Sequence, residues 1–334
     1  MELILKTTQN VLGLLGKKHL KETTMAEDSI MVTVRCLAFN HAKYIRQCLN
    51  GFIMQKTNFD FEVVVHDDAS SDGTAEIIKE YADKYPRLIK PILEEENQYS
   101  KGGNILHNIM NSHTRGKYIA FCEGDDYWTD PLKLQKQVDI LEQHPEYSMV
   151  YTGFQTVDEE GKAILRPDYE RYMRVSFTGD IFPYLLRYGN FVLTVSICLR
   201  KEHYMGTIRE NSPCFLDFNT VIASCANSMA YYLPEKTCCY RQSPNGMMMT
   251  RGKEVSRKTQ KIRKYIVGLY LDGKIQKRGF VRHNIIKIDL LVFAFHLYRN
   301  GADKDYIKWF FKRDRSFLLI APIAIIVGVI RKMK

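Results

Sequence analysis

The stretch F-C-E-G-D-D-Y-W-T-D-P, Phe121–Pro131, decides how the rest of the chain is interpreted. An apolar run, Tyr118–Cys122, leads directly into three acidic side chains, Glu123, Asp125 and Asp126, and then into two aromatic ones. Carboxylates this close repel one another unless a cation lies between them or water screens them. Two interpretations follow: a solvated turn, or a platform for a divalent cation and a phosphate group. The two large aromatic residues disfavour the solvated turn, because loop tips seldom carry them.

Short apolar runs alternate with helical patterns along the first half of the chain. Strands are predicted at 31–37, 61–65, 88–93, 117–122, 147–156 and 190–200, and helices at 44–52, 74–85, 104–113 and 131–144. This alternation is typical of an α/β fold in which helices cover a mostly parallel sheet. Ligands bind such sheets beyond the carboxyl ends of the strands, where Asn40, Asp68 and Asp126 fall. We therefore expect polar loops to meet at one edge of the sheet.

The positive charge of the protein is concentrated in its last quarter. Residues 251–334 contain 21 Lys and Arg against 6 Asp and Glu, although the whole chain of 334 residues has a net charge of only +10. Basic residues flank apolar runs there, as around Phe317–Ile330, which favours an anionic membrane surface over nucleic acid. That run is shorter than the roughly 20 residues of a spanning helix and contains Pro322, so we expect an interfacial anchor. A solvated helical face is the alternative.

The eight cysteines form no C-x-x-C motif, so neither a zinc site nor a disulfide framework is predicted, and a reducing cytosol is the simplest compartment. Residues 1–28 contain leucines at loosely helical spacing and are predicted as a short amphipathic segment. They lack the basic start and the cleavage site of a signal peptide.

Three motifs in order carry a resemblance to a known family. They are V-R-C-L-A-F-N-H at 34–41, F-E-V-V-V-H-D-D-A-S-S-D-G-T at 61–74, and R-G-K-Y-I-A-F-C-E-G-D-D-Y-W at 115–128. Together they resemble the family 2 glycosyltransferases, which have the nucleotide-diphosphosugar transferase fold called GT-A. The resemblance implies a GT-A domain at 29–250, with a nucleotide-sugar half at 29–150 and an acceptor half at 151–250. A basic helical region that associates with membranes would follow at 251–334.

The resemblance also assigns roles to individual residues. The nucleotide-sugar would be bound by Ala38, Asn40, Asp68, Asp125 and Arg241, the last through its diphosphate. Lys101 and Asn104 are further candidates for the nucleotide-sugar, because residues 101–103 are similar to a phosphate-binding loop before a helix. A divalent metal ion, Mn²⁺ or Mg²⁺, would be held by Asp126 and Asp125, with Glu123 standing where many members have the first Asp. The segment S-P-C-F-L-D-F-N, residues 212–219, resembles the stretch that bears the catalytic base, which makes Asp217 the candidate.

The function implied is transfer of a sugar with inversion, from a nucleotide-diphosphosugar such as a UDP-sugar to a hydroxyl of a glycan or lipid-linked acceptor. Such an enzyme would serve cell-surface polysaccharide or glycolipid synthesis from the cytoplasm, with peripheral contact to the anionic inner face of the membrane and none to nucleic acid. Two alternatives remain: a catalytically silent module that only binds sugar nucleotides, and a nucleotidyltransferase. The second would favour a Gly-rich, basic phosphate loop after the first strand, which Phe39, Asn40 and His41 do not provide.

Overall fold

The computed structural model describes residues 30–102, 104–214, 216–243, 252–276, 279–299, 306–314 and 316–330. The predicted amphipathic segment at 1–28 lies outside the described residues, as do Gly103 and the end of the expected GT-A domain at 244–250.

The core of the protein is one eight-stranded sheet with the order β3-β2-β1-β4-β7-β6-β8-β5. The strands are β1 Val32–Ala38, β2 Phe61–Asp67, β3 Ile89–Leu93, β4 Tyr118–Phe121, β5 Tyr127–Trp128, β6 Tyr147–Val157, β7 Ile197–Arg200 and β8 Met229–Arg241. Strands β1 to β4 pair in parallel, as expected. From β4 onward the sheet is mixed, because β7 runs antiparallel to both β4 and β6, while β8 is parallel to β6 and antiparallel to β5. The α/β class is confirmed.

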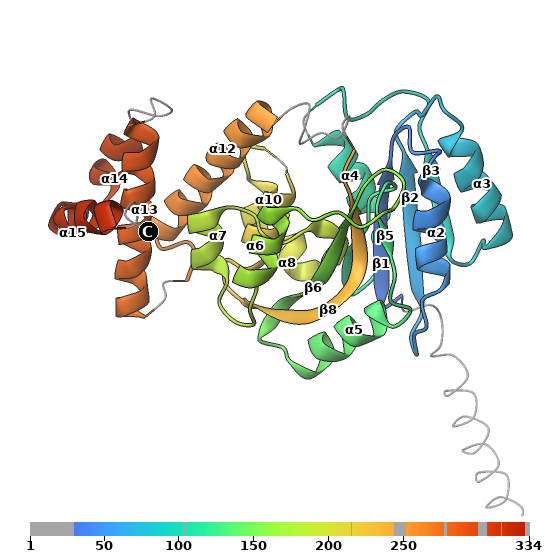
Figure 1. The fold of residues 1–334 in the computed structure, drawn as a ribbon, viewed down its shortest axis with the longest axis horizontal. Helices are drawn as coiled ribbons and strands as arrows, with labels where there is room; N and C mark the ends of the chain where they lie inside the picture. Colours follow the sequence, from blue (N-terminus) through green and yellow to red (C-terminus); the bar gives the residue numbers. More distant parts are fainter. Residues whose placement is uncertain are drawn as a thin grey trace, which may run out of the picture.

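Helices lie on both sides of the sheet, and the last three gather at the end of the molecule opposite α3 (Figure 1). The helices are α2 Ile45–Ile53, α3 Thr74–Lys84, α4 Ile105–Ser112, α5 Lys133–Gln143, α6 Pro167–Val175, α7 Phe182–Tyr188, α8 Lys201–Tyr204, α9 Thr207–Glu210, α10 Asp217–Ser224, α12 Gly252–Leu271, α13 Phe280–Arg299, α14 Tyr306–Arg313 and α15 Phe317–Ile330, with a 3₁₀ turn, η1, at Thr194–Ser196. Among the described ranges, we find no helix whose length and apolarity would suffice to cross a membrane.

Two apolar clusters stabilise the fold. One joins β1, β2 and β4 to α2 and α5, where Phe52 meets the buried ring of Trp128 edge-on at 5.0 Å. The other joins β6 and β7 to α7, α10 and the C-terminal helices, and includes the fully buried Ile262, Ile266 and Tyr270 of α12. Burying each such side chain contributes about 1.5–3 kcal/mol. The basic C-terminal region is therefore packed against α7 and α10, which join it to the rest of the fold.

The strand predicted at 190–200 is wrong in its first half. Only Ile197–Arg200 forms a strand, because the preceding residues turn as η1, where the Ser196 hydroxyl donates to the Leu193 carbonyl at 2.7 Å. The Trp128 indole N–H donates to the Val195 carbonyl at 3.1 Å, so this carbonyl bonds a side chain rather than a neighbouring strand. The longest strand, β8, was not predicted, because Pro234, Glu235 and Lys236 interrupt its apolar pattern where its register with β6 shifts.

Candidate active site

The loops after β1, β2 and β4 meet at the carboxyl edge of the parallel strands, as the sequence predicted. The Asp68 amide donates to the Ala38 carbonyl at 3.0 Å, and the Gly124 amide donates to the Leu37 carbonyl at 2.8 Å. Since β1 lies between β2 and β4, these bonds attach both acidic loops to its end. Ala38, Asp68 and the acidic turn Glu123–Asp126 therefore share one rim.

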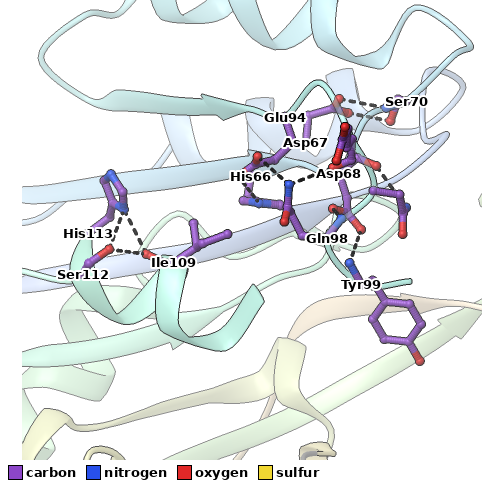
Figure 2. A network of polar contacts seen from close by, with 12 residues as sticks. His66, Asp67, Asp68, Ser70, Glu94, Gln98, Tyr99, Ile109, Ser112 and His113 are labelled. Carbon is purple, nitrogen blue, oxygen red and sulfur yellow. Dashed lines mark hydrogen bonds and ion pairs between the residues drawn. The ribbon is translucent and has the colours of Figure 1, made fainter. Parts of the chain in front are cut away.

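Asp68 is the centre of the polar network in Figure 2. Its carboxylate, in a side chain that is almost fully buried, accepts the backbone N–H of Gln98 at 2.6 Å and of Tyr99 at 3.1 Å. Its carbonyl accepts the Asn97 side-chain amide at 3.1 Å. In this structure Asp68 thus anchors the loop between β3 and α4, which borders the rim.

The other predicted nucleotide contacts lie around the same edge. Asn40 adopts a left-handed conformation, with φ of 55°, and its side-chain oxygen accepts the Ser71 N–H at 3.0 Å. Asn40 therefore joins the loop after β1 to the turn before α3. Lys101 forms an ion pair with Glu96 at 2.8 Å, and Asn104 is exposed at the N-terminal cap position of α4.

The acidic turn is tightly built. The Asp126 N–H donates to the Glu123 carbonyl at 3.0 Å, and the buried Asp126 carboxylate accepts the Arg241 N–H at 2.7 Å. A side chain at Gly124 would place its Cβ 2.8 Å from Nδ1 of His41, so only glycine fits there. The turn thus holds Asp126 inside and leaves the Asp125 side chain 28% exposed.

The carboxylates of this turn repel one another. Burial raises the pKa of Asp126 well above its ordinary value, and the charge of Asp125 raises it further, although the bond from the Arg241 N–H lowers it. Burial likewise raises the pKa of Glu123, followed by the charges of Asp217 and Asp125. A divalent cation among these groups would offset the repulsion.

The carboxylates of the acidic turn are suitable ligands for Mg²⁺ or Mn²⁺ when a substrate phosphate supplies the remaining ligands. Carboxylate oxygens are the ligands these ions prefer, and such ions commonly take one or two carboxylates and complete their shell with substrate phosphates. In the part of the chain that the structure describes, no group of three or more His, Cys, Asp or Glu is arranged to hold an ion by itself. The residues present therefore fit a metal that binds together with a diphosphate.

Arg241 lies at the end of β8, beside the acidic turn. Its buried guanidinium donates to the carbonyls of Asp125 at 2.8 Å and of Asp158 and Glu159 at 2.9 Å each, and to the Gln47 side chain at 2.7 Å. In this conformation all three guanidinium nitrogens serve protein acceptors. In this conformation Arg241 holds the turn, and the nucleotide-sugar contact that the resemblance implied for it stays a prediction.

Asp217 is the first residue of α10 and is exposed. Desolvation by surrounding protein raises the pKa of Asp217, and the charge of Arg209 acts in the opposite direction. Since Asp217 also raises the pKa of Glu123, the two carboxyls are close enough to interact electrostatically. The candidate base therefore lies within electrostatic range of the acidic turn.

His41 is a site residue that the sequence analysis did not single out. Its Nε2 lies 4.0 Å from the Asp125 carboxylate, and among the described residues its buried Nδ1 has no hydrogen-bond partner. Its position directly after Asn40, at the end of the first strand, was the available signal.

The comparisons with known proteins agree with this geometry. An uncharacterized protein of Mycobacterium tuberculosis is 36% identical over 216 residues, covering 65% of this chain and 60% of the relative, so the chain spans less than two thirds of that relative. Bacillus subtilis EpsE, named as a glycosyltransferase, is 40% identical over 109 residues, 33% of this chain and 38% of the relative.

Among solved structures, Staphylococcus aureus TarS in complex with UDP-GlcNAc matches with a TM-score of 0.57 at 17% identity, covering 81% of this chain and 73% of TarS. A likeness at this identity establishes the shared fold. The family model described as glycosyl transferase family 2 matches residues 34–201, which include all three motifs and the acidic turn. The chain therefore belongs to glycosyltransferase family 2.

Proposed function

We propose that the protein transfers a sugar from a nucleotide-diphosphosugar, a UDP-sugar, to a hydroxyl of a glycan or lipid-linked acceptor. The observation that carries the proposal is the acidic turn Glu123–Asp126, whose carboxylates repel one another at the rim shared with Ala38 and Asp68. The UDP-GlcNAc complex of TarS supports the donor class. The name of Bacillus subtilis TuaG, 27% identical over 131 residues, assigns it to teichuronic acid biosynthesis and supports a polysaccharide product.

Asp126 and Asp125 would hold the metal ion, with Glu123 beside them. When bound, Mn²⁺ or Mg²⁺ supplies Lewis-acid stabilisation of the negative charge that develops on the leaving diphosphate. Burial of Asp126 keeps its carboxylate fixed, so little reorganisation is needed as that charge develops. The half-buried Asp125 carboxylate lies 4.0 Å from Nε2 of His41 and would contact the metal together with the donor.

Asp217 would act as the general base. A carboxylate that takes the proton from the attacking hydroxyl contributes about 10² to 10⁴ in rate, and its efficiency increases as its pKa rises toward the working pH. Desolvation moves the pKa of Asp217 in that direction. A single base and direct displacement by the acceptor hydroxyl invert the anomeric carbon.

Replacement of the Asp217 carboxylate by an amide tests this proposal. Asp217→Asn keeps the size of the side chain and removes the base, so sugar transfer should fall about 10² to 10⁴-fold while the UDP-sugar still raises the melting temperature in the presence of Mn²⁺. Unchanged transfer would refute the assignment of the base. Donor binding without transfer by the wild-type protein, across a panel of sugar nucleotides and acceptors, would favour the silent binding module instead.

We also propose that the protein works in the cytoplasm, with its C-terminal region resting on the anionic face of the membrane. In α15, Leu319 is 80% exposed and Ile323 is 49% exposed, so apolar side chains of this helix face outward. Deletion of residues 317–334 should move the protein from the membrane fraction to the soluble one. A partition that stays the same would count against membrane contact through this helix.

A further inference from the structure

Helix α12 carries a row of cations on the face opposite its buried side. Lys253, Arg257, Lys261 and Lys264 recur at intervals of four, four and three residues, which places them within an arc of about 80° around the helix axis. The first three are exposed. The opposite face consists of the buried residues Ile262, Ile266 and Tyr270, which attach the helix to the second apolar cluster. The row is thus presented outward by a helix that is fixed in place.

The cationic row continues onto the C-terminal helices. The Lys264 ammonium lies 5.6 Å from the centre of the Trp309 ring in α14, and Lys308 and Lys312, one turn apart on α14, are both exposed. Helix α15 follows with the outward-facing Leu319. Cations, a tryptophan and exposed apolar side chains on adjoining helices are the combination that binds the headgroup region of a bilayer.

The other end of α12 contacts the segment that leads to the candidate base. The Cys214 thiol donates to the Lys258 carbonyl at 3.4 Å, and α10, which begins at Asp217, packs against α12. Helix α12 therefore runs from the segment before Asp217 to α14 (Figure 1).

We propose that the basic face of α12 (Lys253, Arg257, Lys261 and Lys264) docks on an anionic phospholipid bilayer and places the segment before Asp217 at the headgroups. This inference rests on the proposed function and names its substrate class: the acceptor is presented from a lipid surface rather than free in solution. An anionic bilayer is the partner that fits this surface by charge, because each cation near anionic lipid strengthens binding about fivefold. The exposed Leu319 and Ile323 of α15 suit a bilayer as well.

Binding to vesicles tests the surface without using sugar transfer. The full-length protein should bind vesicles of phosphatidylcholine and phosphatidylglycerol, weakly bind pure phosphatidylcholine vesicles, and lose affinity as salt rises. The variant Lys253→Glu, Arg257→Glu, Lys261→Glu should bind the anionic vesicles at least about 100-fold more weakly. The matched control Lys79→Glu, Lys84→Glu, Arg87→Glu changes three exposed cations around α3, at the far end of the molecule, and should bind like the wild type.

Equal circular dichroism spectra and melting temperatures of the two triple variants would show that both are folded. The proposal is overturned if the α12 variant binds anionic vesicles as tightly as the control, or if the protein binds soluble polyphosphate but no vesicles. If vesicle binding is absent while transfer still depends on Asp217, this inference and the membrane contact proposed for α15 both fail, and the proposed reaction stands. If vesicle binding follows the prediction while no transfer is found, the proposed reaction fails and the surface stands.

Orientation on the bilayer is tested with a fluorophore. The exposed Glu210, at the end of α9, precedes the segment that leads to Asp217, whereas the exposed Lys84 lies at the end of α3. In a Cys214→Ser background, a label on Glu210→Cys should be quenched by lipids that carry a nitroxide near the headgroup, and a label on Lys84→Cys should not. Equal quenching of both labels, or quenching of Lys84→Cys alone, would overturn the orientation.

Discussion

Asp68 and Asp126 are two buried carboxylates on the same rim, and their surroundings are opposite in kind. Asp68 accepts two backbone N–H groups, which stabilise its charge and fix a loop. Asp126 accepts one, and it faces the charges of Asp125 and Glu123, which raise its pKa together with burial. The first carboxylate accepts two hydrogen bonds from the protein, whereas the second carries a repulsion that a divalent cation would offset. We propose that the metal binds at Asp126; Asp68 fixes the neighbouring loop, and its contact with the nucleotide stays a prediction.

The comparison predicts its largest effect for Asp126→Asn. The amide oxygen can still accept the Arg241 N–H, but the charge that would hold the metal is lost, so kcat/KM should fall by about 10² to 10⁴, equivalent to several kcal/mol. Removal of the repulsion should at the same time raise the melting temperature of the metal-free protein. Initial rates of sugar transfer measure the first effect, and thermal unfolding with and without Mn²⁺ measures the second. A metal-free variant that is less stable than the wild type would mean that Asp126 is a structural acid like Asp68.

Asp68→Ala should act mainly on folding. It leaves the N–H groups of Gln98 and Tyr99 without their acceptor, which costs about 2–3 kcal/mol of the free energy of unfolding. Urea unfolding measures this loss, and Asp68→Asn, which keeps one acceptor oxygen, should lose less. If Asp68→Ala abolished donor binding and left stability intact, the carboxylate would be a ligand-binding group after all.

The dependence of stability on pH separates the two kinds of acid. Since the folded-state pKa values of Glu123 and Asp126 lie above those of the unfolded chain, the folded protein binds more protons than the unfolded one between these values. The contribution of these two carboxyls to the free energy of unfolding is therefore fully present below about pH 4, and it is lost as the pH rises through their raised folded-state pKa values. Glu123→Gln, Asp126→Asn should flatten this decline in metal-free protein. Saturating Mn²⁺ with UDP should flatten it as well, and a decline unaffected by either would show that these two carboxyls do not cause it.

Lys101→Ala is expected to have the smallest effect. Its ion pair with Glu96 is largely exposed, so the melting temperature should change by no more than about 1 °C. If Lys101 contacts the donor phosphates, as the phosphate-loop pattern of residues 101–103 predicts, the affinity for UDP should still fall, and its dependence on salt should weaken. Isothermal titration against UDP and against uridine measures this difference. Equal affinities of the variant and the wild type for UDP would remove Lys101 from the donor site.

The sequence predicted the first half of the fold well, because its strands are short buried runs separated by helices with clear apolar faces. It also predicted the shared rim, since parallel neighbours bring their carboxyl ends together. It could not predict β8 or the bonds through which Arg241 holds the acidic turn. The bonds of Arg241 join positions more than 80 residues apart, Asp125 and Asp158 among them, and such pairings leave no local periodic pattern.

The sequence also could not predict that Asp68 and Asp126 have different hydrogen-bond partners. Asp68 and Asp126 both follow buried strands, and each comes directly after another aspartate, so their local patterns are alike. Only the loop that returns to Asp68 from β3, and the end of β8 that returns to Asp126, distinguish them.

The Arg241 guanidinium binds carbonyls on both the acidic turn and the loop after β6. These two segments are consequently ordered when the chain folds, before any nucleotide arrives. Donor capture at this rim should then resemble entry into a rigid receptor, with a fast association rate and little loss of backbone entropy on that side. Slow, adaptive steps would be confined to the acceptor side.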